Sequence, residues 1–240
     1  MGDLAAPFLN SASIDSPVRE RHPDYAAVLI VATGLLPGGS TAHSEALLSA
    51  AEQEAALRIG SGAAQDLSEV QRWREAYKGF GVKPRDARSS IEALLRRIDA
   101  GLPRINRLTD TYNAISIQHS VPIGGEDLRG YRGSARLVIA DGTETFDTVV
   151  DGEEMIVAPA PGEIVWRDDE GVTCRRWNWR QCTRTRLTDQ TTEALFIIDS
   201  LGPDSADNAR AAGEALVHAL LVDSPDAVFH SRLLGAGEET

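Results

Sequence analysis

The spacing of apolar residues changes near Arg136, and this change constrains the fold more than any other feature of the sequence. Before Arg136, short segments bounded by Gly and Pro carry apolar residues at helical spacing. These segments are 42–58, 64–78, 89–100 and 105–120. One further segment with helical spacing, 204–221, lies near the end of the chain. After Arg136, brief apolar or alternating runs are separated by Asp-Gly, Pro-Gly and Glu-Gly pairs, which are typical of turns between strands. Helices followed by strands predict an α+β fold, with helices packed on a largely antiparallel sheet system.

One domain accounts for most of the chain. Residues 25–35 form an apolar run closed by Gly34, which predicts a buried strand. Residues 1–24 carry scattered Pro, Ser and charged side chains, so we expect this segment to be partly flexible. From there the predicted elements continue to about residue 235, a length sufficient to bury a substantial core. The predicted domain therefore covers residues 25–235.

Several classes of protein are not expected from the sequence. The chain has no run of about 20 apolar residues, and its first twenty residues lack the pattern of a secretory leader. Its two cysteines are too few for a disulfide framework, so we expect a cytoplasmic protein that does not associate with membranes. Phosphate-loop, zinc-binding and nucleophile-elbow motifs are absent, and the five histidines are dispersed. We therefore expect neither a metal nor a cofactor.

Basic residues are concentrated in two segments of an otherwise acidic chain of net charge −12. Residues 72–107 contain ten Lys or Arg and four Asp or Glu, whereas residues 172–188 contain five Arg and no acid. Two such segments could bind a few phosphates, while the acidic remainder opposes a long polyanion, and DNA is not an expected partner. The alternative is that each basic segment lies on a different solvated face.

Polar side chains are dense between residues 105 and 127. Asp110, Asn113 and Ser116 are spaced by three and would share one face of a helix. The following pair Gly124-Gly125 would form a turn that lets the backbone approach a ligand, next to the acids Glu126-Asp127. One interpretation is that these polar groups form a ligand-binding site. The other is that these groups cap and bridge the local backbone.

The segment Cys-Arg-Arg-Trp-Asn-Trp-Arg, residues 174–180, gathers cationic and aromatic side chains. Strand-like alternation would place Arg175, Trp177 and Trp179 on one face. Such a platform can stack an unpaired base, an interaction worth about 1–3 kcal/mol. The competing interpretation places both tryptophans in the core and pairs the arginines with nearby carboxylates.

These segments are similar to those of the free-standing B3/B4-domain proteins, relatives of the editing domain in the beta subunit of bacterial phenylalanyl-tRNA synthetase. That parent domain carries an I-N-x-x-x-D-x-x-N stretch, which Ile105-Asn106, Asp110 and Asn113 match in order. Residues 73–97, 112–128, 174–180 and 186–199 resemble the free-standing members. The resemblance extends over roughly residues 25–220. It implies a single B3/B4-type domain of three layers, with an unusual β-sandwich and flanking helices.

The resemblance also implies an activity, the metal-independent hydrolysis of a wrongly attached amino acid from the 3′ end of transfer RNA in trans. The implied catalytic residues are Asn113, Glu126 and Asp127, of which an acid would order the attacking water. The implied substrate-binding residues are Asp110, His119, Gly124, Gly125, Arg176, Asn178, Thr188 and Thr191. Those expected to contact the acceptor end of transfer RNA are Arg88, Arg96, Arg175, Trp177, Trp179, Arg180, Arg184 and Arg186.

The chain also departs from the parent. Gly124 stands where the parent has a histidine, His119 is not in register with it, and the nearest acid in the following strand, Asp199, is out of register with the parent's glutamate. The parent's preference for tyrosine is therefore not expected here. Three alternatives remain: a non-catalytic module that binds an amino acid or small metabolite through Arg176 or Arg180, an RNA-binding protein without hydrolase activity, and a hydrolase of small esters.

Overall fold

The computed structural model describes residues 5–238. Its helices are α1 (Ala5–Ser11), α2 (Ser16–Arg21), α3 (Ala42–Ile59), α4 (Ser68–Gly79), α5 (Ser90–Leu95), α6 (Arg107–His119) and α7 (Ser205–Asp223). Its strands are β1 (Ser13–Ile14), β2 (Tyr25–Thr33), β3 (Ile123–Asp127), β4 (Arg136–Ile139), β5 (Phe146–Val150), β6 (Glu153–Val157), β7 (Ile164–Arg167), β8 (Val172–Arg175), β9 (Arg180–Gln181), β10 (Glu193–Leu201) and β11 (Val228–Gly235). Short 3-10 helices cover Ala64–Asp66 (η1), Ile98–Ala100 (η2) and Leu128–Gly130 (η3). No described helix is long and apolar enough to cross a lipid bilayer.

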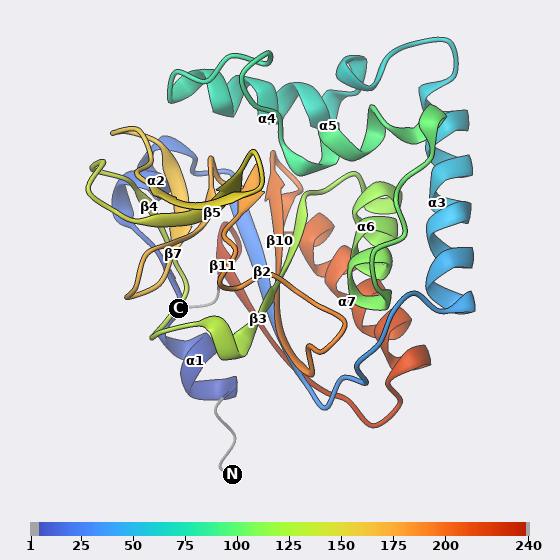
Figure 1. Ribbon diagram of the computed structural model, residues 1–240. Helices are drawn as coiled ribbons and strands as arrows, with labels where there is room; N and C mark the ends of the chain where they lie inside the picture. The colour runs from blue at the N-terminus through green and yellow to red at the C-terminus, as the bar shows by residue number, and fades with distance from the viewer. Residues whose placement is uncertain (1–4, 239–240) are drawn as a thin grey trace.

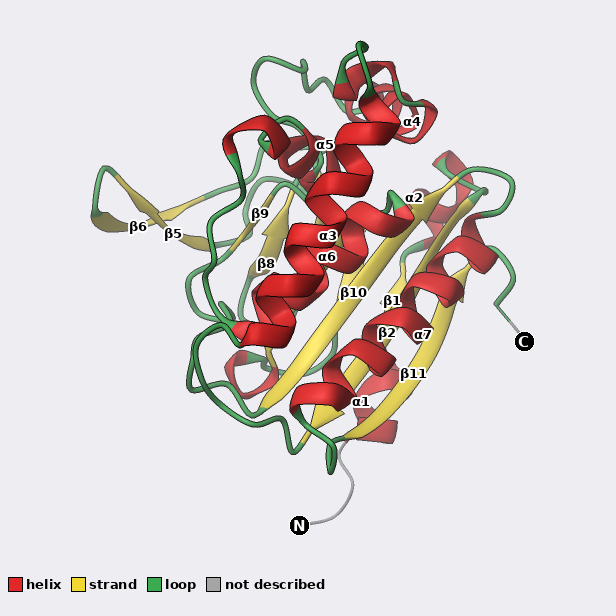
Figure 2. Cartoon of the chain, turned by 90° about the vertical axis from the view of Figure 1, so that its right-hand side faces the viewer, coloured by secondary structure: helices red, strands yellow, loops and turns green. Residues whose placement is uncertain are grey.

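Two sheets and a layer of helices form the body of the domain. One sheet has the order β11-β2-β10-β3 and is antiparallel throughout. The other has the order β1-β4-β7-β8-β9, and β5 pairs only with β6 in a hairpin that projects from the body (Figure 2). Figure 1 shows the four-stranded sheet between the other sheet and helices α6 and α7, with α4 and α5 across one end. The predicted α+β fold is confirmed.

The central strands β2 and β10 set the layered arrangement. β2 is buried along nearly its whole length, because it lies between β11 and β10 and has one layer on each face. Leu29 and Ile197 face a core shared with Trp166 of the second sheet. Ile30 and Phe196 face a core shared with α7. Strands buried on both faces are apolar without alternation, which is the pattern of residues 25–33.

Residues 5–24, expected to be partly flexible, contain α1, β1 and α2. Leu9, Ile14 and Val18 from these elements are buried in the main core. β1 pairs in parallel with β4, so this segment supplies an edge strand to the five-stranded sheet. The segment before β2 is therefore packed onto the domain from residue 5, and residues 1–4 lie outside the described part of the chain.

The segment 123–127, expected to be a turn, is strand β3. It pairs with β10 in an antiparallel register that places Gly124 opposite Ile197 and Glu126 opposite Leu195. Successive strand residues point to opposite faces, so Gly124 and Glu126 face one way and their neighbours face the other. The adjacent acids Glu126 and Asp127 therefore lie in different environments.

Gly125 is required by close packing. A Cβ atom at this position would lie 2.6 Å from Leu187 Cδ1 and 2.9 Å from Tyr112 Cε1. We expect Gly125→Ala to lower the free energy of unfolding by about 1–3 kcal/mol, since the neighbours must move to accommodate the methyl group. Gly79→Ala is the control, because a Cβ there meets nothing within 4 Å. Urea denaturation of both variants measures the effect, and equal midpoints would contradict this account.

Candidate functional site

A pocket of about 610 Å³ opens between the two sheets, beneath α5 and beside α6. Strands β3 and β10 supply its floor, and α6 supplies Tyr112 and Asn113. The turn after β8 supplies Asn178 and Trp179. Segments separated by up to about a hundred residues in the sequence thus meet in one cavity, at the place where the helical half and the strand half of the chain contact each other.

Asp199 lies at one end of the pocket floor, near the end of β10. It is 2% exposed, and its two carboxylate oxygens accept hydrogen bonds from the Tyr25 hydroxyl at 2.6 Å and the Asn178 amide at 3.2 Å. The Asn178 amide oxygen in turn accepts a hydrogen bond from the Tyr77 hydroxyl at 3.0 Å. Burial raises the pKa of Asp199 to about 7, because the charged form is poorly solvated there. Asp199 is a site residue that the sequence interpretation set aside.

Glu126 lies toward the other end of the same floor. It is 1% exposed and accepts a short hydrogen bond from the Tyr131 hydroxyl, which also lies 3.3 Å from the Thr173 hydroxyl. Burial raises the pKa of Glu126 to about 7 and outweighs the hydrogen bonds from Tyr131 and Thr173. A carboxyl group with a pKa near neutrality can accept a proton from water and release it again, which is the requirement for a general base.

Asn113 projects into the pocket from α6. Asn106 caps the N-terminus of this helix, and its side chain accepts a hydrogen bond from the Thr109 N–H at 2.9 Å. The amide of Asn113 forms no hydrogen bond with another described residue and is available to a ligand. Of the polar groups predicted to share its face, Asp110 accepts hydrogen bonds from Ser40 at 2.5 Å and from the Ile105 N–H at 2.9 Å. Asp110 is fully buried and does not line the pocket.

The prediction that Trp177 and Trp179 lie side by side on a strand face is wrong. β8 ends at Arg175, and Arg176 and Trp177 adopt left-handed backbone angles, with φ of 47° and 67°. The chain reverses there, so the strand alternation stops. Trp177 turns into the core and is fully buried, whereas Trp179 is half-buried at the pocket.

Trp177 is the centre of an aromatic cluster. Its ring lies 4.8 Å from Tyr25, 4.9 Å from His22 and 5.2 Å from Trp73 between centroids, each in an edge-to-face arrangement. The indole N–H groups of Trp177 and Trp166 are buried in the pocket wall and make no hydrogen bond of normal geometry with a described residue. Trp177 therefore cannot offer a face to a nucleobase.

Trp179 is the aromatic residue at the pocket that arginines surround. The guanidinium carbons of Arg176 and Arg180 lie 4.3 Å and 4.6 Å from its ring centroid. Arginine over an indole face is an attractive contact that also orients the ring. This arrangement places a flat cationic surface at the edge of the cavity.

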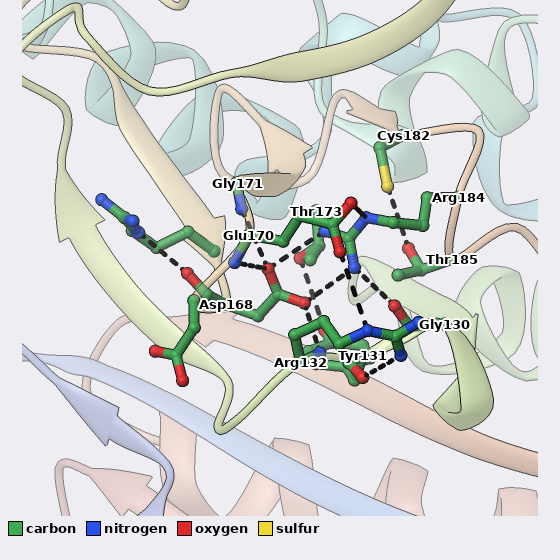
Figure 3. A network of polar contacts seen from close by, with 12 residues as sticks. Gly130, Tyr131, Arg132, Asp168, Glu170, Gly171, Thr173, Cys182, Arg184 and Thr185 are labelled. Atoms are coloured by element: carbon green, nitrogen blue, oxygen red, sulfur yellow. Dashed lines mark hydrogen bonds and ion pairs between the residues drawn. The ribbon is translucent and has the colours of Figure 1, made fainter.

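Two arginines expected to bind RNA are instead occupied by structural ion pairs. Arg175 binds Glu163 through two hydrogen bonds of 2.9 Å and 2.7 Å. Arg184 binds Asp168 through two hydrogen bonds of 2.8 Å and 3.0 Å, and also donates to the Gly130 carbonyl (Figure 3). Burial alone would raise the pKa of Asp168, but the hydrogen bonds from Arg184 and from backbone N–H groups outweigh it and hold that pKa below its ordinary value. These ion pairs connect the loops around β7 and β8.

Four other arginines line the pocket, and they come from both basic segments of the sequence. Arg88, Arg96 and Arg97 belong to the helical half of the chain and Arg180 to β9. The Nη1 atom of Arg96 donates to Gln65 at 3.1 Å, and Arg88 lies 3.5 Å from the Glu92 carboxylate. In the described part of the chain, Arg97 and Arg180 have no acidic partner within 4.0 Å. The pocket thus has acidic groups in its floor and basic groups in its walls.

The remaining predicted site residues lie outside the pocket. Asp127 accepts hydrogen bonds from the Thr191 hydroxyl at 2.8 Å and from the Arg129 N–H at 3.0 Å, and Thr191 also accepts from the Thr188 N–H at 3.0 Å. These three residues hold a surface loop together. Four others are not among the residues that line the pocket: His119 at the end of α6, Gly125, Arg186 and Arg176. Arg176 lies next to the lining, since it packs on Trp179 and donates to the Asp86 carbonyl.

The fold and its pocket define an α+β domain with a polar cavity between its layers. A family model described as the B3/4 domain matches residues 72–215, more than half of the chain, and the chain belongs to that family. Among solved structures, it is similar to an N-terminal fragment of the phenylalanyl-tRNA synthetase beta subunit from Pyrococcus horikoshii, at 14% identity and a TM-score of 0.48. That alignment covers 93% of this chain and 50% of the other. No curated protein matches the chain.

Proposed function

We propose that this protein hydrolyses the ester between an amino acid and the 3′ end of a transfer RNA, in trans and with its own side chains. The observation that carries the proposal is the presence of Glu126, a buried carboxyl with a pKa near 7, in the same pocket as the unpaired amide of Asn113. Membership of the B3/4 family, together with the resemblance of the sequence to the editing domain of the phenylalanyl-tRNA synthetase beta subunit, supports the choice of ester.

In the proposed reaction, Glu126 accepts a proton from a water molecule as the water oxygen bonds to the ester carbonyl carbon. The Asn113 amide N–H donates to the oxygen that gains negative charge, which stabilises the tetrahedral intermediate. The bond between carbonyl carbon and ribose oxygen then breaks, and the proton held by Glu126 passes to the departing ribose oxygen. The products are the free amino acid and a transfer RNA with a free terminal hydroxyl.

The walls of the pocket supply the features that recognise an RNA end. Arg88, Arg96, Arg97 and Arg180 provide positive charge for terminal phosphates, and Trp179 provides a flat surface for the last base. Both basic segments contribute to this one cavity, so the proposed RNA path requires no second basic surface. The acidic remainder of the chain restricts the contact to the end of the molecule.

The proposal is tested with a panel of transfer RNAs, each carrying one of several mismatched amino acids, incubated with the purified protein. We expect rapid loss of the ester for one or two amino acids and a loss of activity of about 100-fold or more in Asn113→Ala, because an oxyanion donor contributes about that much. Gln118→Ala, at a partly exposed position of the same helix that does not line the pocket, serves as the control. No hydrolysis across the panel would contradict the proposal.

A second candidate is a module that binds a free amino acid without hydrolysis. The acidic floor and basic walls favour it, because they match the opposite charges of a zwitterion. Arg176, one of the arginines considered for the ligand carboxylate, donates to the Asp86 carbonyl at 3.2 Å, so Arg180 would bind the carboxylate instead. Calorimetric titration with free amino acids distinguishes this candidate when the panel shows no hydrolysis.

A further inference from the structure

The buried carboxylates of this protein fall into two groups. Outside the pocket, each has a partner that compensates its charge. Arg74, Arg167, Arg175 and Arg184 form ion pairs with Glu92, Glu144, Glu163 and Asp168, respectively. Asp110 lies in the first turn of α6, where N–H groups and the helix dipole favour a negative charge. This pattern follows the rule that a buried charge is paired or stabilised by hydrogen bonds.

The two carboxylates in the pocket floor differ from the others. Neither Glu126 nor Asp199 has a Lys, Arg or His nitrogen within 4.0 Å in residues 5–238. Both are buried by the surrounding protein, and both face the cavity. In a protein that otherwise compensates its buried acids, two uncompensated acids in one pocket indicate that the ligand supplies the missing positive charge.

The two carboxylates occupy separate positions. Glu126 lies opposite Leu195, and Asp199 follows Leu195 by four residues on the same face of β10. Four residues of a strand span roughly 13 Å. One small cation cannot bind both carboxylates at this separation, so they have different roles. The reaction proposed above uses Glu126, which leaves Asp199 for recognition.

We propose that Asp199 binds an ammonium group of the ligand. Hydrogen bonds from Tyr25 and Asn178 hold its carboxylate in one orientation, and Tyr77 holds Asn178 in turn. A preoriented carboxylate binds an ammonium group more strongly than a mobile one, because less conformational freedom is lost. The indole groups of Trp166 and Trp177 interact with Asp199 and Tyr25, respectively, and add to the fixed surroundings of this carboxylate.

This inference rests on the proposed function only for the nature of the ligand, an aminoacyl group on a ribose. The basic walls orient the phosphate-bearing end outward and the acidic floor orients the amino acid inward. Two sources of the ammonium group fit this orientation, the α-amino group of any amino acid and the side chain of a basic one. Both have the same chemistry, and the experiment distinguishes them.

The test is calorimetric binding of adenosine derivatives that carry the acyl group through a stable 3′-amide. These probes bind without being hydrolysed, so the result does not depend on catalysis. The first pair is alanyl and lactyl, in which a hydroxyl replaces the α-ammonium. The second pair is lysyl and norleucyl, which differ at the side-chain ammonium. We expect at least tenfold tighter binding of the ammonium-bearing member of one pair.

The same measurements on Asp199→Asn show whether this carboxylate is responsible. We expect the preference to disappear because the ammonium-bearing member of that pair binds more weakly, while the other member of the same pair keeps its affinity. Asp189→Asn, a change of an exposed acid outside the pocket, should retain the preference. Equal affinities within both pairs for the unmodified protein would overturn the inference, and this result does not depend on whether Asp199→Asn folds. A preference that persists in Asp199→Asn would also overturn it. Failure of the proposed function is a separate outcome, since it appears only in the deacylation panel.

Discussion

We expect replacement of Glu126 by glutamine to lower the rate of the proposed aminoacyl ester hydrolysis by about 100-fold or more at pH 7.5. The amide fills the same space and can still interact with the Tyr131 hydroxyl, but it cannot accept a proton from water. General base catalysis commonly contributes about 10²–10⁴-fold, and the oxyanion contact of Asn113 remains in the variant. Single-turnover hydrolysis of the best substrate from the panel measures the effect.

The pH dependence of the rate gives an independent signature of Glu126. Its pKa is raised to about 7, and the base acts only in its ionised form, so the rate rises with pH through about 7 and levels off above it. Asp199 has a pKa of about 7 as well, so the rates are compared with the substrate saturated by protein, where binding at Asp199 does not limit the rate. Under that condition we expect the rise to be absent in Glu126→Gln. Asp127→Asn is the matched control, because the adjacent acid binds Thr191 and Arg129 outside the pocket. Equal losses in the two variants, or an unchanged pH profile in Glu126→Gln, would refute the assigned role.

The second large effect is on stability. We expect Trp177→Ala to lower the free energy of unfolding by about 3–5 kcal/mol, because it removes a fully buried indole and leaves a cavity among three aromatic rings. Trp179→Ala removes the same side chain from a half-buried position two residues away. We expect it to lower stability by at most about 1.5 kcal/mol. Urea denaturation of the two variants measures both values.

The two tryptophans should also differ in their effect on RNA. Trp179→Ala should weaken binding of an acceptor-end oligonucleotide, because stacking of one base contributes about 1–3 kcal/mol. Trp177→Ala, measured at a temperature where the variant is folded, should bind this oligonucleotide as the unmodified protein does, because Trp177 does not contact the base. A larger stability loss in Trp179→Ala than in Trp177→Ala would contradict the placement of the two rings.

The sequence predicted the elements of the fold well where one type of periodicity extends over many residues. The helix over 105–120 corresponds to α6, and the apolar run 25–35 corresponds to β2. It predicted poorly where composition suggests a turn but the tertiary structure imposes a strand. Gly124 and Gly125 occur in β3 because the neighbouring layers approach this strand closely, as the contacts of Leu187 and Tyr112 with Gly125 show. A glycine pair does not distinguish a turn from a crowded strand.

The sequence predicted only part of the candidate site, because it does not show which side chains the folded protein brings together. Asn113, Glu126 and Trp179 lie in the pocket as a site would require, but Arg175 and Arg184 bind Glu163 and Asp168, as the competing interpretation of that segment expected. Counts of charge along the chain do not show which arginines are already paired. Asp199 ends the segment 186–199 that resembles the free-standing members, but it is out of register with the parent's glutamate. Its role is therefore inferred from its place in the pocket and from the absence of a cationic side chain near it in residues 5–238.

A crystal structure with adenosine carrying an amide-linked aminoacyl group would test the central claim most directly, namely that the pocket beneath α5 binds an aminoacylated RNA end. The account predicts the carbonyl group within hydrogen-bond distance of Asn113, the ammonium group at Asp199 and the adenine against Trp179. A ligand bound elsewhere, such as the groove between α7 and β11, with the pocket free of it, would contradict the account.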